Sequence, residues 1–311
     1  MSNKEKWNKD NTVLVSSNTG FLFSGCHKDG YTIVHPYKGK TIFDRILREI
    51  SFKFKILSKF WYNKKILSHK PKYILVWDTL ITVDYLKWLQ RNNPNAQINF
   101  IYYNMVGKAK HLFPSQIPDG IRVWTYDIYD SERYNINLFH SYMYFDCYKI
   151  PHKNDDYDVF FVGRDKGRGE FLLDLEQKLN DLGLKTKFII TADGRLSKKK
   201  DYYSKPIPYE EVVDYVSRSK AVLNIVMENQ HGVTLRDIES IFIKTKLITT
   251  NKHIVDADLY DENNVFILDE NNLSKIVDFL NRPYKEINRE ILEKHTIAGM
   301  IEEITSKDIT F

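Results

Sequence analysis

The stretch QHGVTLRDIES, residues 230–240, decides the fold because it connects two apolar runs. The run before it, residues 221–227, has the length and β-branched content of a buried strand, and residues 246–250 form a second such run. The stretch between them is therefore predicted to be a helix, with Thr234 as its N-cap and Asp237 placed close to a capping box. A glycine turn that leads from a strand into a helix is also how α/β proteins present N–H groups to phosphate. Both interpretations fit these residues.

The composition is that of a soluble globular protein. The chain has 311 residues, enough for two domains, with 42% hydrophobic and 28% charged residues and a formal net charge of +5. The first residues contain no apolar leader, and no stretch approaches the length of a membrane span, so we expect a cytoplasmic protein. Cys26 and Cys147 lie far apart without the spacing of a disulfide framework or zinc site, and we interpret both as packing residues.

Strand-like and helix-like segments alternate along the chain, which predicts parallel sheets in two Rossmann-type units. A polar stretch around Pro151 indicates a boundary, after which the alternation restarts. We therefore expect a first domain over residues 1–150, a second over residues 151–285, and a final helix within residues 286–311 that crosses back or forms an interface. The main predicted strands are residues 13–17, 72–77, 98–103, 122–126, 159–163, 186–191, 221–227, 246–250 and 265–268.

The second half opens with another turn of interest, VFFVGRDKGRGEFL, residues 159–172. Gly163 ends a predicted strand, and Arg164, Lys166 and Arg168 cluster in the turn that leads into the next helix. In an open α/β sheet this turn and the Gly232 turn lie on the same edge, where ligands bind. Arginine and lysine side chains with helix N–H groups suit a diphosphate, although solvated basic turns are the alternative.

The second half resembles the donor-binding domain of GT-B glycosyltransferases, especially the family-four type and relatives in bacterial capsule and lipopolysaccharide assembly. The resemblance covers residues 157–283 and rests on VGRDKG, PYEEVVDYVSRSKAVLNIV and HGVTLRDIESIFIKTKLITTN. It implies an α/β protein of GT-B-like fold, with two Rossmann-type domains facing a central cleft. The sequence departs from the family pattern at three positions: His231 replaces a glutamate, and Thr234 and Arg236 stand where the family usually has glycine and proline.

The resemblance also implies roles for residues at the two turns. Arg164 and Lys166 neutralise the departing diphosphate of a nucleotide-sugar donor, UDP-sugar by default, without a metal or other cofactor. Glu239 binds the ribose, although a buried glutamate paired with Lys244 or Lys246 is the alternative. The predicted donor-binding residues are Gly163, Arg164, Lys166, Gly232, Val233, Thr234, Arg236 and Glu239.

Candidates for the reaction itself come from strand ends in the first half. Asp78 follows YILVW and Asp127 follows RVWTY, and either is a candidate base, although an acid at such a position is often a turn or N-cap residue. His231 is a third candidate, for contact with the sugar. The acidic groups at residues 154–158 and 256–258 are interpreted as solvated rather than metal-binding.

A helix is predicted to begin at Thr41 with Asp44 at its third position, and to end in a basic, aromatic stretch at residues 51–72 that contains no acid. That stretch is either a solvated helix end or a patch for anionic membrane with Phe54, Trp61 and Tyr62 at the headgroups, while nucleic acid has little support. The apolar stripe of the helix comprises Ile42, Phe43, Ile46, Leu47, Ile50, Phe54, Leu57 and Trp61.

Together these observations predict a hexosyltransferase that moves a sugar from a nucleotide diphosphate to a surface polysaccharide or lipid-linked oligosaccharide. We expect it in the cytoplasm or peripherally on the inner face of the cytoplasmic membrane. The alternatives are a glycerol-phosphate-type transferase and a non-catalytic nucleotide or polyanion binder that uses the same residues.

Overall fold

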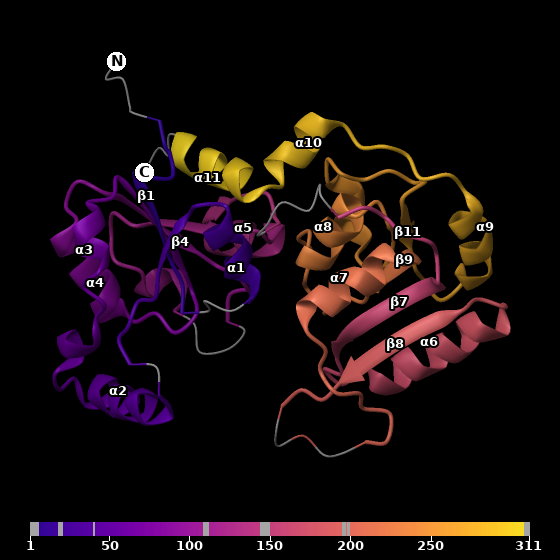
Figure 1. Ribbon diagram of the computed structural model, residues 1–311, viewed down its shortest axis with the longest axis horizontal. Helices are drawn as coiled ribbons and strands as arrows, with labels where there is room; N and C mark the ends of the chain where they lie inside the picture. The colour runs from indigo at the N-terminus through magenta and orange to yellow at the C-terminus, as the bar shows by residue number, and fades with distance from the viewer. Residues whose placement is uncertain are drawn as a thin grey trace. The chain divides into compact units, whose positions relative to one another are not determined.

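The computed structural model describes residues 6–17, 21–39, 41–107, 112–143, 150–194, 197 and 200–307. The chain forms two compact units (Figure 1). Unit 1 comprises Met1–His140 together with Thr296–Phe311, and unit 2 comprises Ser141–His295. Each unit has one sheet whose paired neighbours all run parallel, which confirms the predicted fold class of two α/β domains.

Unit 1 contains a six-stranded sheet in the order β2-β1-β3-β4-β5-β6. Its central strand β3 is buried at every residue, as expected when helices cover both faces of a parallel sheet. The strands are β1 (Thr12–Val15), β2 (Thr32–Val34), β3 (Tyr73–Trp77), β4 (Gln97–Ile101), β5 (Arg122–Thr125) and β6 (Asn137–Leu138). The helices are α1 (Phe21–Lys28), α2 (Ile42–Phe54), α3 (Ile66–His69), α4 (Val83–Asn92), α5 (Ile128–Tyr134) and α11 (Ile297–Ser306), with 3-10 turns η1 (Ser58–Trp61) and η2 (Pro114–Gln116).

Side chains that alternate along β4 reach the two faces of this sheet. Ile98 and Phe100 join a core cluster that contains buried residues of α3 and α4. Gln97, on the opposite face, donates from Nε2 to the carbonyl of Ile304 in α11 at 3.4 Å. The C-terminal helix therefore covers the face of the unit 1 sheet that α3 and α4 leave open.

Unit 2 contains a five-stranded sheet in the order β11-β10-β9-β7-β8. The neighbouring residues Phe160 and Phe161 of β7 point to opposite faces: Phe161 packs with buried residues of α6 and α9, and Phe160 with those of α7. The strands are β7 (Tyr157–Arg164), β8 (Thr186–Thr191), β9 (Ser219–Asn224), β10 (Lys246–Thr249) and β11 (Val265–Ile267). The helices are α6 (Gly169–Asp181), α7 (Tyr209–Ser217), α8 (Leu235–Phe242), α9 (Ile276–Asn281) and α10 (Arg289–Lys294), with 3-10 turns η4 (Lys252–Asp256) and η5 (Leu273–Lys275).

The division between the units differs in position from the predicted boundary near residue 150. The backbone N–H of Met143 donates to the carbonyl of His295 at 2.8 Å, and the Nδ1 atom of His295 lies 2.6 Å from the carbonyl of Ser141. These bonds attach the residues after His140 to unit 2. The expected final helix is divided into α10 and α11, because Thr296 begins α11 as its N-cap.

Two other expectations concern cysteines and membranes. Cys26 is buried, and burial raises the pKa of its thiol to about 12, as expected for a packing residue. Cys147 lies outside the described residues. In the part of the chain that the structure describes, no helix is long and apolar enough to cross a membrane.

Glu303 attaches α11 to the end of β6. Its carboxylate accepts hydrogen bonds from the backbone N–H of His140 at 2.9 Å and from the Nζ of Lys307 at 2.6 Å, and one of its oxygens lies 3.0 Å from Nδ1 of His140. Burial alone raises the pKa of this carboxyl, but the bonds from His140 and Lys307 lower it to about 2. The depressed pKa means that the ionised form stabilises unit 1.

We expect Glu303→Gln to lower the free energy of unfolding of unit 1 by about 2 kcal/mol at pH 7. The folded-state pKa is depressed, so this stabilisation is present above the ordinary glutamate pKa and is lost as pH falls toward 2; the variant and the parent should therefore converge in acid. All five tryptophans of the chain lie in residues 7–124, so tryptophan fluorescence during urea unfolding reports on unit 1.

Glu290→Gln, which changes an exposed carboxylate in unit 2, is the matched control and should leave the fluorescence transition in place. An equal loss of stability for Glu303→Gln at pH 7 and at pH 3 would contradict the role given to the ionised carboxylate.

Candidate functional site

The strand order of unit 2 has its switch point between β7 and β9, where the direction of winding reverses. Ligands of open α/β sheets bind outside the carboxyl ends of the strands at such a point. Gly163 and Arg164 end β7 and Lys166 follows them; we name residues 163–168 the β7 turn. The turn after β9 contains Gly232 and Thr234. Since β7 and β9 are paired neighbours, both predicted turns lie on this edge, as the sequence indicated.

The two arginines of the β7 turn differ in their surroundings: Arg164 is exposed, and Arg168 packs against the protein. Arg164 is exposed, and its guanidinium forms no ion pair with any carboxylate of the described residues. Arg168 lies over the ring of Phe161 at 5.6 Å and donates from one NH group to the carbonyl of Ile225, just after β9. A Cβ at Gly163 would lie 3.1 Å from the Phe161 ring and 3.4 Å from the Arg168 guanidinium. The absence of a side chain at Gly163 therefore leaves space for the Arg168 guanidinium.

Asp165 fills the N-terminus of α6. Its carboxylate accepts from the N–H of Gly169 at 2.8 Å, from the hydroxyls of Tyr202 at 2.8 Å and Tyr203 at 2.6 Å, and from Nζ of Lys200 at 3.0 Å. The Tyr203 hydrogen bond, opposed by burial and supported by Tyr202 and Lys200, holds the pKa of Asp165 well below its usual range. A carboxylate of the protein thus occupies the place where the β7 turn would otherwise offer helix N–H groups to a phosphate.

Lys166 has a left-handed backbone, with φ of 49°, and its N–H donates to Asp193 at 2.8 Å. Its side chain is exposed. The β7 turn can therefore meet an anion through the side chains of Arg164 and Lys166.

The predicted cap of α8 is confirmed. The backbone N–H of Thr234 donates to the carboxylate of Asp237 at 2.7 Å, within a capping box. Asn224, the last residue of β9, donates from Nδ2 to Asp237 at 2.6 Å and to the Thr234 hydroxyl at 3.0 Å. Burial raises the pKa of Asp237 to about 6 against these hydrogen bonds. The N–H groups of Leu235 and Arg236, at the first two helical positions, have no intrahelical acceptor.

Asn251 holds the turn before α8 against the end of β10. Its Nδ2 group lies 3.3 Å from the carbonyls of both His231 and Gly232. Val233 is half-buried, and its carbonyl accepts a hydrogen bond from the hydroxyl of Ser141. The turn is therefore fixed from two directions.

Glu239 is buried, with 1% of its surface exposed. Its two oxygens accept from the hydroxyl of Tyr209 in α7 and from the guanidinium of Arg236 one turn earlier. Burial raises the pKa of this carboxyl, against the effect of both partners. Of the two interpretations of Glu239, the structure shows the buried ion pair.

The cation that pairs with Glu239 is not one of the two lysines considered in the sequence. Lys244 pairs with Glu286 at 2.7 Å, and the Nζ of Lys246 donates to the carbonyls of Phe279 at 2.5 Å and Arg282 at 2.6 Å. Arg236 stands where a proline was expected from the resemblance, and it supplies the charge locally.

His231 stacks on His253, a residue that the sequence analysis did not select. The ring centroids lie 3.9 Å apart with 23° between the planes. His231 belongs to the turn before α8 and His253 to η4 after β10, so the pair lies on the same carboxyl edge. No motif indicated His253, because its contact with His231 spans two strands of the sheet.

Asp78 and Asp127 are both fully buried at strand ends of unit 1. Asp127 is the N-cap of α5 and accepts from the N–H of Tyr129 at 3.0 Å and of Asp130 at 3.3 Å, which is the structural alternative stated for it. Asp78 follows β3, and the hydroxyl of Thr79 lies 3.4 Å from its Oδ1 atom. Neither carboxylate is presented to solvent.

The acidic groups at residues 154–158 and 256–258 both take part in ion pairs. Asp156 pairs with Arg218, and Asp158 pairs with Lys220 at 2.8 Å. Asp258 lies 3.0 Å from the Nε2 atom of His295. Their neighbours are thus cationic or histidine side chains of unit 2.

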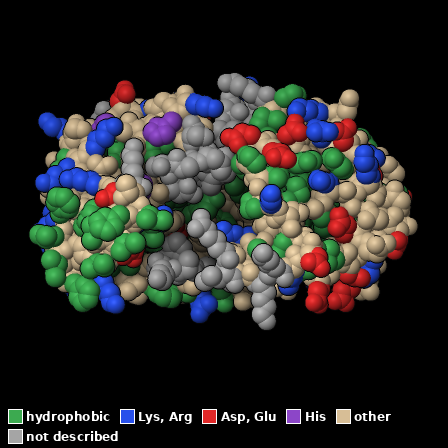
Figure 2. Space-filling view, turned by 60° about the horizontal axis from the view of Figure 1, so that its bottom comes forward, with side chains coloured by type: hydrophobic (Ala, Val, Ile, Leu, Met, Phe, Trp, Pro, Cys, Tyr) green, Lys and Arg blue, Asp and Glu red, His purple; other side chains and the backbone are tan. Residues whose placement is uncertain are grey.

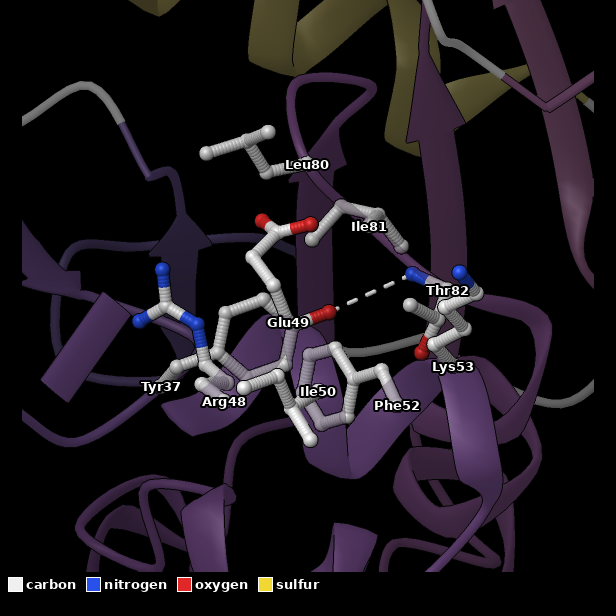
Figure 3. A pocket seen from close by; sticks show the side chains of 9 residues that line it. All are labelled: Tyr37, Arg48, Glu49, Ile50, Phe52, Lys53, Leu80, Ile81 and Thr82. Carbon is white, nitrogen blue, oxygen red and sulfur yellow. Dashed lines mark hydrogen bonds between the residues drawn. The ribbon is translucent and has the colours of Figure 1, made fainter. Parts of the chain in front are cut away.

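Unit 1 contains a pocket of about 440 Å³ at the carboxyl edge of its own sheet (Figure 3). The loop after β3, at Leu80 to Thr82, forms one wall, and α2 forms the other through Arg48, Glu49 and Lys53. The hydroxyl of Tyr37, beyond β2, accepts a hydrogen bond from the N–H of Thr82 at 3.2 Å, the dashed line in Figure 3. Apolar walls with a few charged groups are typical of a small-molecule site.

We expect Arg236→Ala to destabilise unit 2 by about 3 kcal/mol, because it leaves the buried Glu239 carboxylate without its cation. Thermal unfolding followed by circular dichroism measures the loss. Adding Glu239→Gln to Arg236→Ala should recover part of it, since the amide carries no charge. Lys178→Ala, which removes an exposed cation from α6, is the control. If Arg236→Ala unfolded at the parent temperature, the ion pair would not stabilise the fold.

No protein-family model and no curated protein sequence matches this chain. Solved structures do match over most of its length. A sucrose-phosphate synthase from Thermosynechococcus elongatus aligns with a TM-score of 0.57 and 11% identity over 94% of this chain and 97% of that chain. A DNA-modifying β-glucosyltransferase, studied with its substrate uridine diphosphoglucose, aligns with a TM-score of 0.51 and 13% identity over 94% and 98%.

A glycosyltransferase from Rickettsia africae ESF-5 aligns with a TM-score of 0.50 and 12% identity over 94% of this chain and 88% of that chain. At these identities the likeness shows the fold. The chain has the two-domain α/β fold of GT-B glycosyltransferases.

Proposed function

We propose that the protein is a glycosyltransferase that takes a sugar from a nucleotide-diphosphate donor. The observation that supports this most is the position of two turns, after β7 and after β9, on neighbouring parallel strands at the switch point of unit 2. One turn presents the exposed Arg164. The other leads into α8, whose first N–H groups have no acceptor within the helix. The GT-B fold supports the same assignment.

In this proposal the donor diphosphate lies between the two turns. Arg164 and Lys166 approach it from β7, and Arg236, oriented by the buried Glu239, approaches it from α8. The Nε–H of Arg168 is buried and has no acceptor among the described residues, so an oxygen bound nearby would satisfy it. Glu239 therefore acts as a positioning residue for Arg236 rather than as a direct ribose ligand. Stabilisation of the leaving diphosphate by these cations provides the main rate enhancement, without a metal.

We propose that the sugar end of the donor meets the stacked pair of His231 and His253. His231 is half-buried and His253 exposed, so their rings line the carboxyl edge, whereas Asp78 and Asp127 are fully buried. The acceptor is proposed to enter the unit 1 pocket beside Tyr37, Arg48 and Lys53. A surface polysaccharide or lipid-linked oligosaccharide, as in relatives of the family-four type, fits a pocket with both apolar and charged walls. UDP-glucose, the substrate named for one structural neighbour, is the first donor to test.

We expect one of UDP, GDP, CDP or ADP to raise the unfolding temperature of the purified protein. At a hundredfold excess over the dissociation constant the stabilisation is about 2.7 kcal/mol. Arg164→Ala should abolish the shift without lowering the unfolding temperature of the unliganded protein, because Arg164 is exposed. Lys178→Ala, an exposed cation elsewhere on unit 2, should bind as the parent does. No shift with any of the four nucleotides would count against a donor site here.

With the nucleotide identified, mass analysis of the acceptor separates the possible activities. We expect an increment of one hexose for each nucleoside diphosphate released, and turnover that persists in a chelator. A phosphodiester increment would indicate a glycerol-phosphate-type transferase. Tight nucleotide binding without any product would indicate a non-catalytic binder and contradict the proposal.

A further inference from the structure

Helix α2 presents its apolar side chains to solvent. The helix begins after Thr41 as predicted, and Thr41 and Asp44 form a capping box at its start. Its apolar residues recur at the spacing that the sequence indicated. Ile42 is 75% exposed and Phe43 66% exposed, and the stripe continues through Ile46, Leu47, Ile50 and Phe54, all at least 41% exposed. The only buried residue among those of the helix is Arg48. A helix on the surface of a globular protein normally has the opposite arrangement.

The inner side of α2 is held by specific contacts, so the exposure is a property of the folded unit. The guanidinium of Arg48, 4% exposed, lies 5.0 Å from the centre of the Tyr37 ring. Phe52 packs on the same ring, with centroids 5.0 Å apart, and on Tyr62 at 6.3 Å. Both contacts fix the rotation of the helix and turn its apolar stripe outward.

The apolar surface continues beyond the end of α2. Lys55 and Leu57 adopt left-handed backbone conformations, with φ of 55° and 53°, that turn the chain into η1. Ile56, Leu57 and Phe60 are then 62%, 76% and 63% exposed. We name the exposed apolar residues of 42–60 the α2 face. Figure 2 shows hydrophobic side chains gathered on this part of unit 1, with basic side chains beside them.

This finding corrects the prediction for residues 51–72. Tyr62, expected at lipid headgroups, is 1% exposed and belongs to the core, and Trp61 is half-buried. Phe54 is exposed as expected, at 62%. The apolar contact surface therefore lies earlier in the chain than the sequence indicated.

The charges around the α2 face are mostly positive: Asp44 and Glu49 lie within α2, and the charged residues that follow them, up to residue 77, are all basic. Residues 50–77 contain seven lysines and no aspartate or glutamate, and Lys53, Lys55 and Lys59 are exposed beside the apolar side chains. An amphipathic helix with bulky apolar residues and flanking lysines binds the interface of an anionic bilayer, where apolar side chains enter the headgroup region and each lysine adds electrostatic attraction. A second copy of the chain would instead bring two sets of lysines together.

We propose that the α2 face docks on an anionic phospholipid bilayer. The apolar side chains insert between headgroups, and Lys53, Lys55 and Lys59 contact lipid phosphates. Docking depends on unit 1 alone and does not require the proposed glycosyl transfer, so the two proposals can fail separately.

The test is co-sedimentation of the full chain with phosphatidylcholine vesicles, with and without phosphatidylglycerol. We expect binding to the phosphatidylglycerol vesicles that weakens as salt is raised. Phe43→Glu with Ile46→Glu should weaken partitioning about a hundredfold, because two exposed apolar anchors are lost and two negative charges are added. Lys53→Gln, Lys55→Gln and Lys59→Gln together should weaken it by a similar factor, about a hundredfold, and remove the preference for anionic lipid.

The matched control is Phe171→Glu with Leu173→Glu, which makes the same chemical change at exposed apolar positions of α6 in unit 2 and should bind as the parent does. Circular dichroism checks that each variant is folded, and tryptophan fluorescence checks unit 1 in particular. Equal binding of the parent to both vesicle types, or unchanged binding of the α2 variants, would overturn the proposal. So would a lack of vesicle binding together with a dimer that Phe43→Glu dissociates, which would assign the face to a second copy.

Discussion

The buried carboxylate of Asp165 holds the carboxyl edge of unit 2 together. A carboxylate removed from water is stable only when hydrogen bonds and cations satisfy it, and Asp165 receives them from two other segments. Gly169 belongs to α6, while Lys200, Tyr202 and Tyr203 follow β8. A Cβ at position 169 would lie 2.2 Å from the Tyr202 hydroxyl and 2.8 Å from the Asp165 carboxylate, so any other residue would displace the hydrogen bond between these two groups. One ionised group thus fixes the end of β7, the start of α6 and the loop after β8.

The same principle recurs at α8 and changes how the edge meets an anion. Asp237 occupies the N-cap region, and Glu239 pairs internally with Arg236. The protein therefore fills two positions near its helix starts with its own carboxylates. What is left for a ligand is mainly a set of arginine and lysine side chains around the switch point. A diphosphate has the charge and the oxygen geometry that arginine forks prefer.

Local patterns predicted most of the fold, because they depend on neighbours in sequence. The apolar runs gave the main strands, and the Thr234 and Asp237 spacing gave the cap of α8. The partners of Glu239 were missed, since Tyr209 lies thirty positions away on another helix. The break at His295 was missed for the same reason: its bond to Ser141 spans 154 positions. Side-chain partners at this distance require the packed structure.

Helix α2 shows where periodicity stops being informative. A stripe of apolar residues predicts a helix equally well when the stripe faces a core and when it faces a lipid interface. The deciding contact is tertiary: Arg48 over Tyr37 and Phe52 beside it assign the inner side.

Helix α2 also borders the unit 1 pocket. Arg48, Glu49 and Lys53 of α2 also line the pocket at the carboxyl edge of the unit 1 sheet. One helix therefore forms both a wall of the proposed acceptor pocket and the proposed bilayer contact. A polar acceptor head carried on a membrane lipid would reach that pocket from the surface on which the α2 face docks. The two proposals, although separately testable, thus describe one geometry in which the rotation of α2, fixed by Arg48, determines both.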